Sequence, residues 1–580
     1  MWKKLFQSIR EYKKATLLAP AYVTLEVIIE CFIPFITALL VNQIKAGCTF
    51  DVVLHYGLIL IALASMSLTF GWLSGRAAAT AASGFARNLR KDLFYKIQSF
   101  SFENIDRFSS SSLVTRLTTD VSNVQNAFMM LIRVAIRSPL MLIFAVVMSF
   151  IMGGRLALIF VVVIPILALG LFFIIRKAFP IFRRVFRKYD ALNRSIQENV
   201  QGIRVVKSFV REEHEKQKFG AAAEDLREEF TKAEKILAFN SPMMQFCLYV
   251  NMIFILTFGA YTIASGGGAS GFNVGQLSSL MIYSFQTLMS LMMLSMVFVM
   301  VTIADESGRR IVEVLDEQST LASPERAVQA VADGSVDFDR VSFRYSEKAE
   351  RMALQDIDLH IRSGEFIGIL GTTGSSKTSL VQLIPRLYDA TTGTVSVGGR
   401  NVKDYDLGAL RDSVSVVLQS NLLFSGTIAE NLRWGNPEAT DEEIRHACVL
   451  AQADDFIRSF PQGYETRMEQ GGTNVSGGQK QRLCIARALL KKPRILILDD
   501  STSAVDTHTD AKIRQALKEF LPETTKIIIA QRVASVMDAD RIVLMDKGGI
   551  QAIGTHEQLL DADASYREVY ASQNKAGEEE

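Results

Sequence analysis

Residues 365–384 read EFIGILGTTGSSKTSLVQLI: an apolar run, a loop of small residues and a helix-forming segment. This order predicts a buried strand, a tight loop and a helix. The loop from Gly371 to Thr378 matches the phosphate-binding pattern G-x-x-x-x-G-K-[ST], except that Ser376 replaces the last glycine. In such a loop backbone N–H groups surround phosphates, Lys377 reaches the outer phosphates, and Thr378 offers a hydroxyl to Mg²⁺. The stretch therefore predicts an α/β nucleotide-binding domain.

The amino-acid composition differs sharply between the part of the chain before this domain and the domain itself. The chain has 580 residues and 49% hydrophobic residues, and its long apolar runs lie before about residue 304. This length exceeds what a single core supports, so several domains are expected. A net charge of only +2 gives no reason to expect nucleic acid as a partner. We predict a transmembrane domain over 1–304, a linker over 305–334 and the nucleotide-binding domain over 335–580.

The first domain contains six stretches long and apolar enough for membrane helices, which need about 20 residues each. They lie near 17–44, 54–75, 134–153, 156–175, 242–265 and 277–303. The two long connections, 76–133 and 176–241, are rich in arginine and lysine, which marks the cytoplasmic side. We therefore expect a multi-pass membrane protein with both termini in the cytoplasm. Each long connection reads as two helices with a break, near 99–112 and near 200–215.

Further motifs follow the phosphate loop in a specific order. They are VVLQSNLLFSGTIAENL (416–432), VSGGQKQRLCIARALL (475–490), ILILDD (495–500), STSAVD (501–506) and IIIAQR (527–532). This order and spacing resemble the ATPase domain of an ATP-binding cassette (ABC) transporter. The six-span half is similar to that of the type IV exporters, so the resemblance covers essentially the whole chain.

The resemblance implies ATP and Mg²⁺ as cofactors and assigns roles to individual residues. Tyr345 would stack on adenine, Gln419 would touch the metal and sense the membrane half, and Asp499 would hold Mg²⁺ together with Thr378. The signature loop beginning at Ser476 would serve the nucleotide of the opposite cassette, and Ser503 to Asp506 would line the contact between cassettes. The breaks near 99–112 and 200–215 would be coupling helices. The implied nucleotide-binding residues are Tyr345, Gly371, Thr372, Thr373, Gly374, Ser375, Ser376, Lys377, Thr378, Ser379, Gln419, Ser476, Gly477, Gly478 and Gln479.

Two catalytic positions depart from the family pattern. Asp500 stands where the family has the glutamate that polarises the attacking water, and Gln531 stands where it has a histidine. The aspartate is shorter by about 1 Å, and a misplacement of that size can cost on the order of 100-fold in rate. With Ser376, these changes resemble the weaker chain of a heterodimeric exporter, whose partner supplies the catalytic glutamate and histidine. An aspartate that works after a small backbone shift is the alternative.

Two features of the spans bear on the transported substrate. Glu26 and Glu30 lie one helical turn apart in the first span, and a carboxylate at that depth faces either a partner or a water-filled cavity. They would attract cationic or amphipathic substrates, or they pair with polar groups on another helix. In the last span a methionine stripe that includes Met289, Met293 and Met296 suits promiscuous binding, although such a stripe more often reflects helix packing.

Together these features predict one half of an ATP-driven ABC exporter in the cell membrane. Its partner would be a second half-transporter, and its substrates would be amphipathic drugs or lipid-like compounds. A lipid or peptide exporter is the alternative within the class. From another class, an ATP-gated channel or regulatory subunit would bind nucleotide without turnover.

Overall fold

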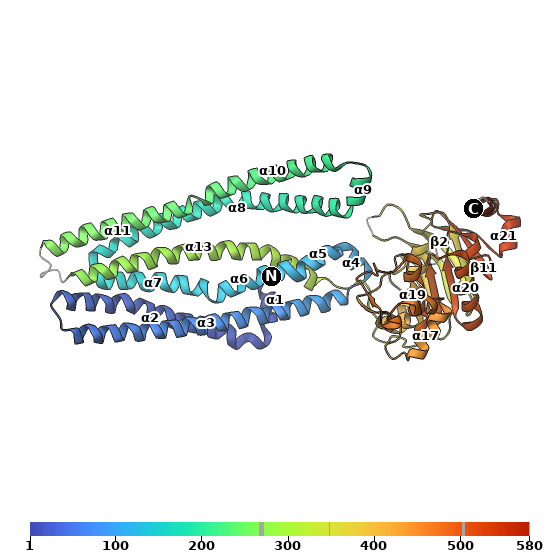
Figure 1. Ribbon diagram of the computed structural model, residues 1–580, viewed down its shortest axis with the longest axis horizontal. Helices are drawn as coiled ribbons and strands as arrows, with labels where there is room; N and C mark the ends of the chain where they lie inside the picture. The colour runs from blue at the N-terminus through green and yellow to red at the C-terminus, as the bar shows by residue number, and fades with distance from the viewer. Residues whose placement is uncertain (266–271, 347–348, 502–504, 579–580) are drawn as a thin grey trace. The chain divides into compact units, whose positions relative to one another are not determined.

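The computed structural model describes residues 1–265, 272–346, 349–501 and 505–578, which form two compact units (Figure 1). The helical unit comprises Met1–Gln98 and Ser109–Glu317, and the α/β unit comprises Ser99–Phe108 and Gln318–Glu580. The segment Ser99–Phe108 therefore belongs, by its contacts, to the second unit, although it interrupts the first in sequence.

The helical unit is built from long helices joined by short breaks. A helix satisfies its backbone hydrogen bonds internally, which a lipid environment requires. The helices are α1 (Trp2–Leu5), α2 (Lys13–Lys45), α3 (Phe50–Gln98), α5 (Ser110–Thr115), α6 (Val121–Ile132), α7 (Val134–Gly153), α8 (Leu158–Gln201), α9 (Ile203–Ser208), α10 (Glu212–Leu237), α11 (Asn240–Ala264) and α13 (Val274–Asp316). Shorter helical turns are η1 (Phe6–Tyr12), η2 (Arg116–Asp120) and η3 (Gly154–Ala157).

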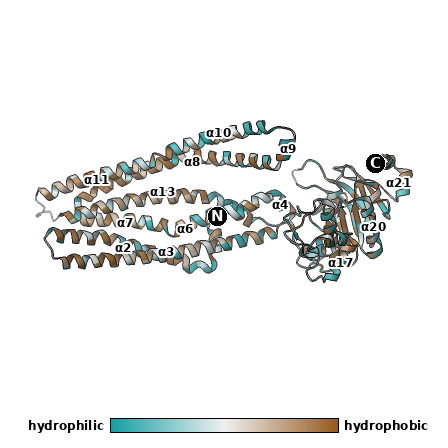
Figure 2. Ribbon diagram, in the orientation of Figure 1, coloured by the Kyte–Doolittle hydropathy of each residue, from teal (hydrophilic) through white to brown (hydrophobic). Residues whose placement is uncertain are grey.

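Five helical stretches of the described chain are long and apolar enough to cross a membrane. One of them, Ser110–Phe182, contains α7 and the first part of α8, which the short turn η3 separates. The spans are therefore α2, α3, α7, α8, α11 and α13. Hydrophobic residues concentrate along α2 and α3, whereas the part of α10 toward α9 is largely hydrophilic (Figure 2). The predicted fold class, a six-helix transmembrane domain followed by an α/β domain, is confirmed.

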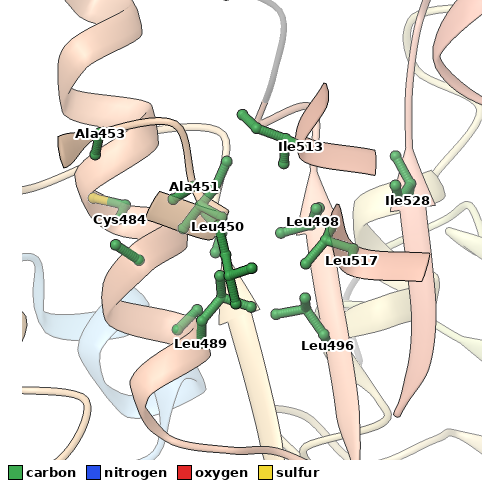
Figure 3. Close-up of a cluster of buried hydrophobic side chains, with 14 of the residues drawn as sticks. Leu450, Ala451, Ala453, Cys484, Leu489, Leu496, Leu498, Ile513, Leu517 and Ile528 are labelled. Carbon is green, nitrogen blue, oxygen red and sulfur yellow. The ribbon is translucent and has the colours of Figure 1, made fainter. Parts of the chain in front are cut away.

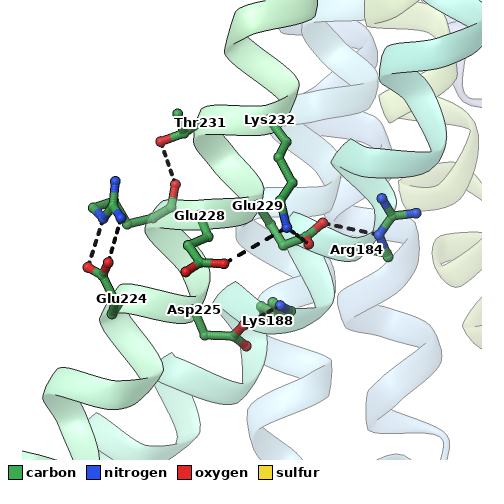
Figure 4. A network of polar contacts seen from close by, with 9 residues as sticks. Arg184, Lys188, Glu224, Asp225, Glu228, Glu229, Thr231 and Lys232 are labelled. Atoms are coloured by element: carbon green, nitrogen blue, oxygen red, sulfur yellow. Dashed lines mark hydrogen bonds and ion pairs between the residues drawn. The ribbon is translucent and has the colours of Figure 1, made fainter.

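Beyond the apolar spans, α8 and α10 run side by side and are joined by ion pairs (Figure 4). Arg184 donates to Glu229 at 3.1 Å, and Lys188 donates to Asp225 at 2.6 Å. Exposed pairs of this kind contribute about 0–1 kcal/mol each. These ion pairs help to select which faces of α8 and α10 meet, and they add little to the stability of the helix pair.

The N-terminal segment is bent and does not form one continuous helix. Arg10 has non-helical backbone angles, and η1 packs against α3 rather than continuing α1. Ser8 donates to Asp92 at 2.8 Å, Arg10 donates to the same carboxylate at 2.7 Å, and Trp2 donates to Asp305 at 3.1 Å. These polar partners on α3 and α13 outweigh local periodicity and hold the segment against the bundle.

The α/β unit contains a six-stranded sheet in the order β12-β11-β3-β10-β9-β6, a four-stranded antiparallel sheet in the order β2-β1-β4-β5, and the pair β7-β8. The strands are β1 (Val336–Phe343), β2 (Leu354–Ile361), β3 (Phe366–Gly371), β4 (Thr392–Val397), β5 (Arg400–Asn401), β6 (Val414–Val417), β7 (Gly426–Thr427), β8 (Arg467–Met468), β9 (Ile495–Asp499), β10 (Thr525–Ile529), β11 (Arg541–Asp546) and β12 (Gly549–Gly554). In the six-stranded sheet only β12 runs antiparallel to its neighbour.

The described part of the α/β unit also contains helices and short helical turns. They are α4 (Phe102–Phe108), α14 (Lys377–Gln382), α15 (Leu407–Ser413), α16 (Ile428–Leu432), α17 (Asp441–Leu450), α18 (Asp454–Ser459), α19 (Gly477–Leu490), α20 (Thr507–Phe520), α21 (His556–Ala562) and α22 (Ala564–Glu578), with turns η4 (Val402–Asp404), η5 (Gly463–Glu465) and η6 (Val533–Ser535). Leu496 and Leu498 of β9 pack between side chains of α19 and α20 (Figure 3). A strand buried on both faces explains the uninterrupted apolar run ILIL.

One close approach in the helical unit can be tested directly. A Cβ on Gly275, in the first turn of α13, would lie 2.1 Å from the carbonyl oxygen of Ala38 on α2. We expect Gly275→Ala to destabilise the unit by about 1–3 kcal/mol, because one of the two helices must move. Gly220→Ala on α10 is the matched control, since a Cβ there meets nothing within 4 Å. Thermal unfolding in detergent measures both, and equal midpoints would contradict the predicted close packing.

Candidate functional site

Four parallel strands place the predicted nucleotide residues at one edge of the sheet. In the register Ile529 of β10 lies beside Ile369 of β3 on one side and Asp499 of β9 on the other. The residues at the ends of these strands are therefore neighbours too: Gly371 ends β3, Asp500 follows β9 and Gln531 comes two positions after β10. Strand β6 ends beside β9 in the same direction, so Gln419 reaches the same edge. Ligands of open α/β sheets bind at this carboxyl edge.

The phosphate loop depends on backbone conformations that favour glycine. A Cβ on Gly371 would lie 2.3 Å from the carbonyl oxygen of Met545, and Gly374 has φ +87°. Ser376 has φ +70°, in the left-handed region, at the position where the common pattern has glycine. A Cβ in that region costs about 1–2 kcal/mol. Ser376 therefore strains the loop without blocking it.

The residues predicted to hold the outer phosphates and the metal lie together. Lys377 donates to the carbonyl oxygens of Gly371 and Thr372, at 2.8 and 3.0 Å, and Thr378 donates to Asp499 at 3.1 Å. Burial raises the pKa of Asp499 above its usual range, and burial lowers the pKa of Lys377. A cation bound at Asp499 would lower the pKa of this carboxyl again, and a phosphate bound at Lys377 would raise the pKa of the lysine.

The donor set fits Mg²⁺ that arrives with a nucleotide. Among the residues that the structure describes, no group of three His, Cys, Asp or Glu could hold a metal alone. Magnesium prefers oxygen ligands and commonly takes one or two carboxylates plus substrate phosphates. The hydroxyl of Thr378 and the carboxylate of Asp499 supply such a pair.

The second acid of the site, Asp500, is held by two side-chain amides. Gln531 Nε2 donates to Asp500 Oδ2 at 2.8 Å, and Gln419 Nε2 donates to the same oxygen at 3.1 Å. Burial raises the pKa of Asp500, and both amides offset part of the rise. The two family departures, Asp500 and Gln531, are thus in direct contact, which the sequence could not establish.

The signature residues occupy a separate helix start. Ser476 caps α19: its hydroxyl accepts from the Gln479 N–H at 3.2 Å, and the Gln479 side chain accepts from the Ser476 N–H at 3.0 Å. Gly477 and Gly478 form the first turn. The serine proton is left to donate to an incoming anion. Within the described chain no hydrogen bond or ion pair joins Ser476 to the phosphate loop.

Tyr345 lies in an aromatic cluster that extends to helix α4. Its ring contacts Tyr388 edge-on at 5.2 Å, and its hydroxyl lies 2.8 Å from the Ser379 hydroxyl. Tyr388 in turn donates to Asp106 of α4 at 2.8 Å, and its ring lies 6.1 Å from that of Phe102. Helix α4, inside the predicted break near 99–112, is thus two side chains away from the expected adenine position.

The remaining predicted residues are placed less tightly. Helix α9, in the second predicted break, exposes Ile203 and Val205. Of the segment Ser503 to Asp506, Ser503 and Ala504 lie outside the described residues, and Asp506 caps α20. The sequence analysis assigned this segment to the contact between cassettes and did not identify Asp506 as the cap of a helix.

The membrane carboxylates have a partner that the sequence analysis missed. Arg137 of α7 donates to both oxygens of Glu30, at 2.8 and 2.6 Å, and lies 3.5 Å from Glu26. A lone arginine inside a predicted span was the available signal, because such a cation needs a counter-charge. Met289 is half-buried, whereas Met293 and Met296 are exposed on α13.

The strain at Ser376 yields a prediction. Because bound phosphate requires the left-handed turn, Ser376→Gly is expected to tighten ATP binding about fivefold, equivalent to ~1 kcal/mol. Ser376→Ala keeps the Cβ and should leave the affinity unchanged. Titration with a fluorescent ATP analogue measures both. An equal gain in the two variants would show that the hydroxyl, not the backbone, limits binding.

Comparison with known proteins places these residues in a family. Residues 17–301 match the model of the ABC transporter transmembrane region, and residues 354–503 match that of the ABC transporter. An uncharacterized ABC transporter ATP-binding protein of Bacillus subtilis is 37% identical over 574 residues, 98% of both chains. The ATP-dependent lipid A-core flippase of Syntrophus aciditrophicus is 31% identical over 85% of this chain and 81% of its own.

A solved structure shows the same fold over the whole chain. The structure of a bacterial Atm1-family ABC exporter with ATP bound superposes with a TM-score of 0.81 at 24% identity, covering 98% of each chain. A transmembrane domain followed by an ATP-binding domain on one chain is the architecture of a half-transporter. The chain therefore belongs to the ABC transporters and has the type IV exporter fold.

Proposed function

We propose that this chain is the weakly hydrolysing subunit of a heterodimeric, ATP-driven exporter in the cell membrane, with both termini in the cytoplasm. The observation that carries the proposal is the pair of amide hydrogen bonds from Gln419 and Gln531 to one oxygen of Asp500. Its partner is a second half-transporter that supplies the catalytic glutamate and histidine. Its substrates are amphipathic drugs or lipid-like compounds.

In this proposal the chain's own site binds ATP well enough to hold it. Lys377 exchanges the loop carbonyls for phosphate oxygens, while Thr378 and Asp499 hold Mg²⁺, which supplies charge neutralisation at the phosphates. Tyr345 presents its ring to adenine. All four residues are of the type that the family has at these positions, so ATP binding is retained.

Hydrolysis is weak because the groups that should act on water are engaged with each other. In-line attack needs a base within hydrogen-bond reach of the water. Asp500 is one methylene shorter than glutamate and already accepts from two amides. Gln531 can donate a hydrogen bond, but it cannot take up the proton that a histidine could carry. The two departures from the family pattern, Asp500 and Gln531, therefore meet at one atom, Asp500 Oδ2.

The signature loop acts at the other site. Ser476 and the first N–H groups of α19 suit a γ-phosphate, because helix starts carry unpaired N–H donors. The sequence of this loop is unaltered, so the partner's nucleotide receives a complete set of donors. One chain thus contributes poorly to its own site and fully to its partner's.

Substrate class rests on the spans and on one relative. A relative at 31% identity is named a lipid A-core flippase, which supports lipid-like cargo. The exposed methionines Met293 and Met296 on α13 offer flexible apolar contacts for amphipathic molecules.

The chain alone should hydrolyse ATP slowly. Reconstituted in lipid without a partner, two copies would form two defective sites, each with Asp500 as its only acid at the water. We expect turnover at least about 100-fold below that of the assembled pair. Phosphate release at saturating ATP measures it. Turnover of the single chain equal to that of the pair would contradict the heterodimer.

In the pair, two substitutions should differ in their damage. Ser476→Ala removes a contact to the γ-phosphate of the competent site and is expected to lower turnover by about 100-fold. Asp500→Asn alters a site that already works poorly, so turnover should stay within about threefold of the parent. Asp500→Glu alone should not create a second fast site, because Gln531 remains. The reverse order of damage would show that the two sites have been assigned the wrong way round.

A further inference from the structure

A charged groove lies between α2 and α3, which run side by side in the helical unit (Figure 1). Four of its lining residues are ionisable, Glu26, Glu30, Arg76 and Arg133, and Leu68 and Trp72 border them. Its volume is about 890 Å³, within the ~300–1,000 Å³ of small-ligand sites. The catalytic residues belong to the other unit, so this groove has no part in ATP chemistry.

Two glycines of α3 make room for the charged side chains. A Cβ on Gly71 would lie 3.1 Å from Glu26 Oε1, and a Cβ on Gly75 would lie 3.4 Å from an Arg133 nitrogen. Between them Ser74 donates to the Ala19 carbonyl of α2 at 3.0 Å and holds the helices together. The carboxylate and the guanidinium therefore rest against bare backbone at a fixed helix contact.

The charges in the groove are only partly paired. Arg137 takes both oxygens of Glu30 and approaches Glu26 Oε1, but Glu26 Oε2 is buried without a hydrogen-bond partner. Glu26 itself is only 7% exposed. A buried carboxylate oxygen without a donor is unfavourable, because it has lost its hydrogen bonds to water. This oxygen lacks a donor.

Two cations of the groove make few polar contacts in the described chain. Arg133 makes one long hydrogen bond, 3.5 Å, to the Gly71 carbonyl, and Arg76 lies over the Trp72 ring at 5.6 Å. Neither forms an ion pair with any residue that the structure describes. Counting Glu26, Glu30, Arg76, Arg133 and Arg137, two negative and three positive charges leave one excess positive charge. A purely cationic ligand is therefore disfavoured here, despite the two glutamates.

The position along α3 indicates the depth of the groove. The Trp72 side chain is 60% exposed, and Arg76 is exposed as well. Tryptophan and arginine gather at membrane–water interfaces. From Leu68 toward the start of α3, the exposed residues Ile61, Leu58 and Leu54 are apolar. Trp72 and Arg76 thus mark the side of the groove nearer the Gln98 end of α3 as its headgroup side, while Glu26 and Glu30 lie within the span of α2, and an apolar face leads from the groove into the bilayer.

We propose that this groove binds a membrane phospholipid with a primary ammonium in its headgroup, of the phosphoethanolamine type. The phosphate accepts from Arg76 and Arg133, and the ammonium donates to Glu26 Oε2. The acyl chains follow the exposed apolar residues of α3. A zwitterion satisfies both unpaired charges at once, whereas a simple cation or a simple anion satisfies only one.

The test is native mass spectrometry of the full-length chain, purified as expressed, with dioleoyl phosphatidylethanolamine added. Dioleoylglycerol, which has the same chains and no phosphate, is the ligand control. Arg76→Gln is expected to weaken phospholipid binding about tenfold, the loss of one charge-assisted contact. Arg155→Gln, at the exposed turn between α7 and α8, is the matched control and should bind as the parent does.

Glu26→Gln tests the ammonium contact separately. It should reduce binding of phosphatidylethanolamine about tenfold and leave phosphatidylglycerol, which lacks an ammonium, unchanged. Arg76 is exposed and Arg133 is half-buried, so Arg76→Gln keeps the test valid if a variant of Arg133 fails to fold.

Several results would overturn the proposal. Equal binding of dioleoylglycerol and phosphatidylethanolamine, or equal losses in the Arg76 and Arg155 variants, would show that the groove does not read the phosphate. Displacement of the lipid by millimolar inorganic phosphate would point to a free anion as the ligand. Loss of lipid when a second half-transporter assembles would assign the groove to the interface between chains. Binding needs neither ATP nor turnover, so these outcomes are independent of the proposed export function.

Discussion

The parallel pairing of β10 with both β3 and β9 is the constraint on which the nucleotide site depends. The register sets Ile529 beside Ile369 and Asp499, so the three chain segments leave the sheet at one level. The phosphate loop lies more than a hundred residues before the two aspartates, and Gln531 lies 31 positions after Asp500, yet all of them share one edge. A slip of two residues in β10 would carry Gln531 about 6.6 Å along the strand, beyond hydrogen-bond reach of Asp500. The core of Leu496, Leu498 and Ile528 that holds this register is therefore as necessary to the chemistry as the polar residues.

That register explains why two departures from the family pattern act as one. Asp500 and Gln531 are 31 positions apart in sequence, but they are joined by a 2.8 Å hydrogen bond. A longer acid at this position would extend past the amide, and a histidine would compete for protons there. Gln419 adds a second donor from the segment after β6, the strand that pairs with β9 on the side away from β10. The two amides therefore offset part of the rise that burial causes in the pKa of Asp500, and they occupy the oxygen that would otherwise accept from the attacking water.

The sequence predicted the parts of this molecule that depend on local pattern. Six apolar stretches and the strand–loop–helix around Gly371 each follow from periodicity or from a short motif. It could not predict what depends on contacts between distant elements. Arg137 pairs with Glu30 across two helices, and no spacing in the chain encodes that pair. Likewise α4 contacts Tyr388, although the sequence places α4 between two membrane-associated segments. Ser376 has a left-handed backbone conformation, which explains why the motif prefers glycine at this position. The sequence pattern records that preference but does not give its cause.

The two carboxylate clusters show how different surroundings set different solutions to the same problem. Asp500 is buried in the α/β unit and accepts from neutral amides, which stabilise its charge without cancelling it. The negative charge of the site is preserved, and a divalent cation with its nucleotide can still bind. Glu30 lies in a membrane span, where an uncompensated charge is far more costly, and it is matched by the full positive charge of Arg137. Glu26 shares that arginine incompletely and keeps one oxygen without a donor. The incomplete pairing at Glu26, rather than the number of acids, is what makes the span able to recognise a ligand.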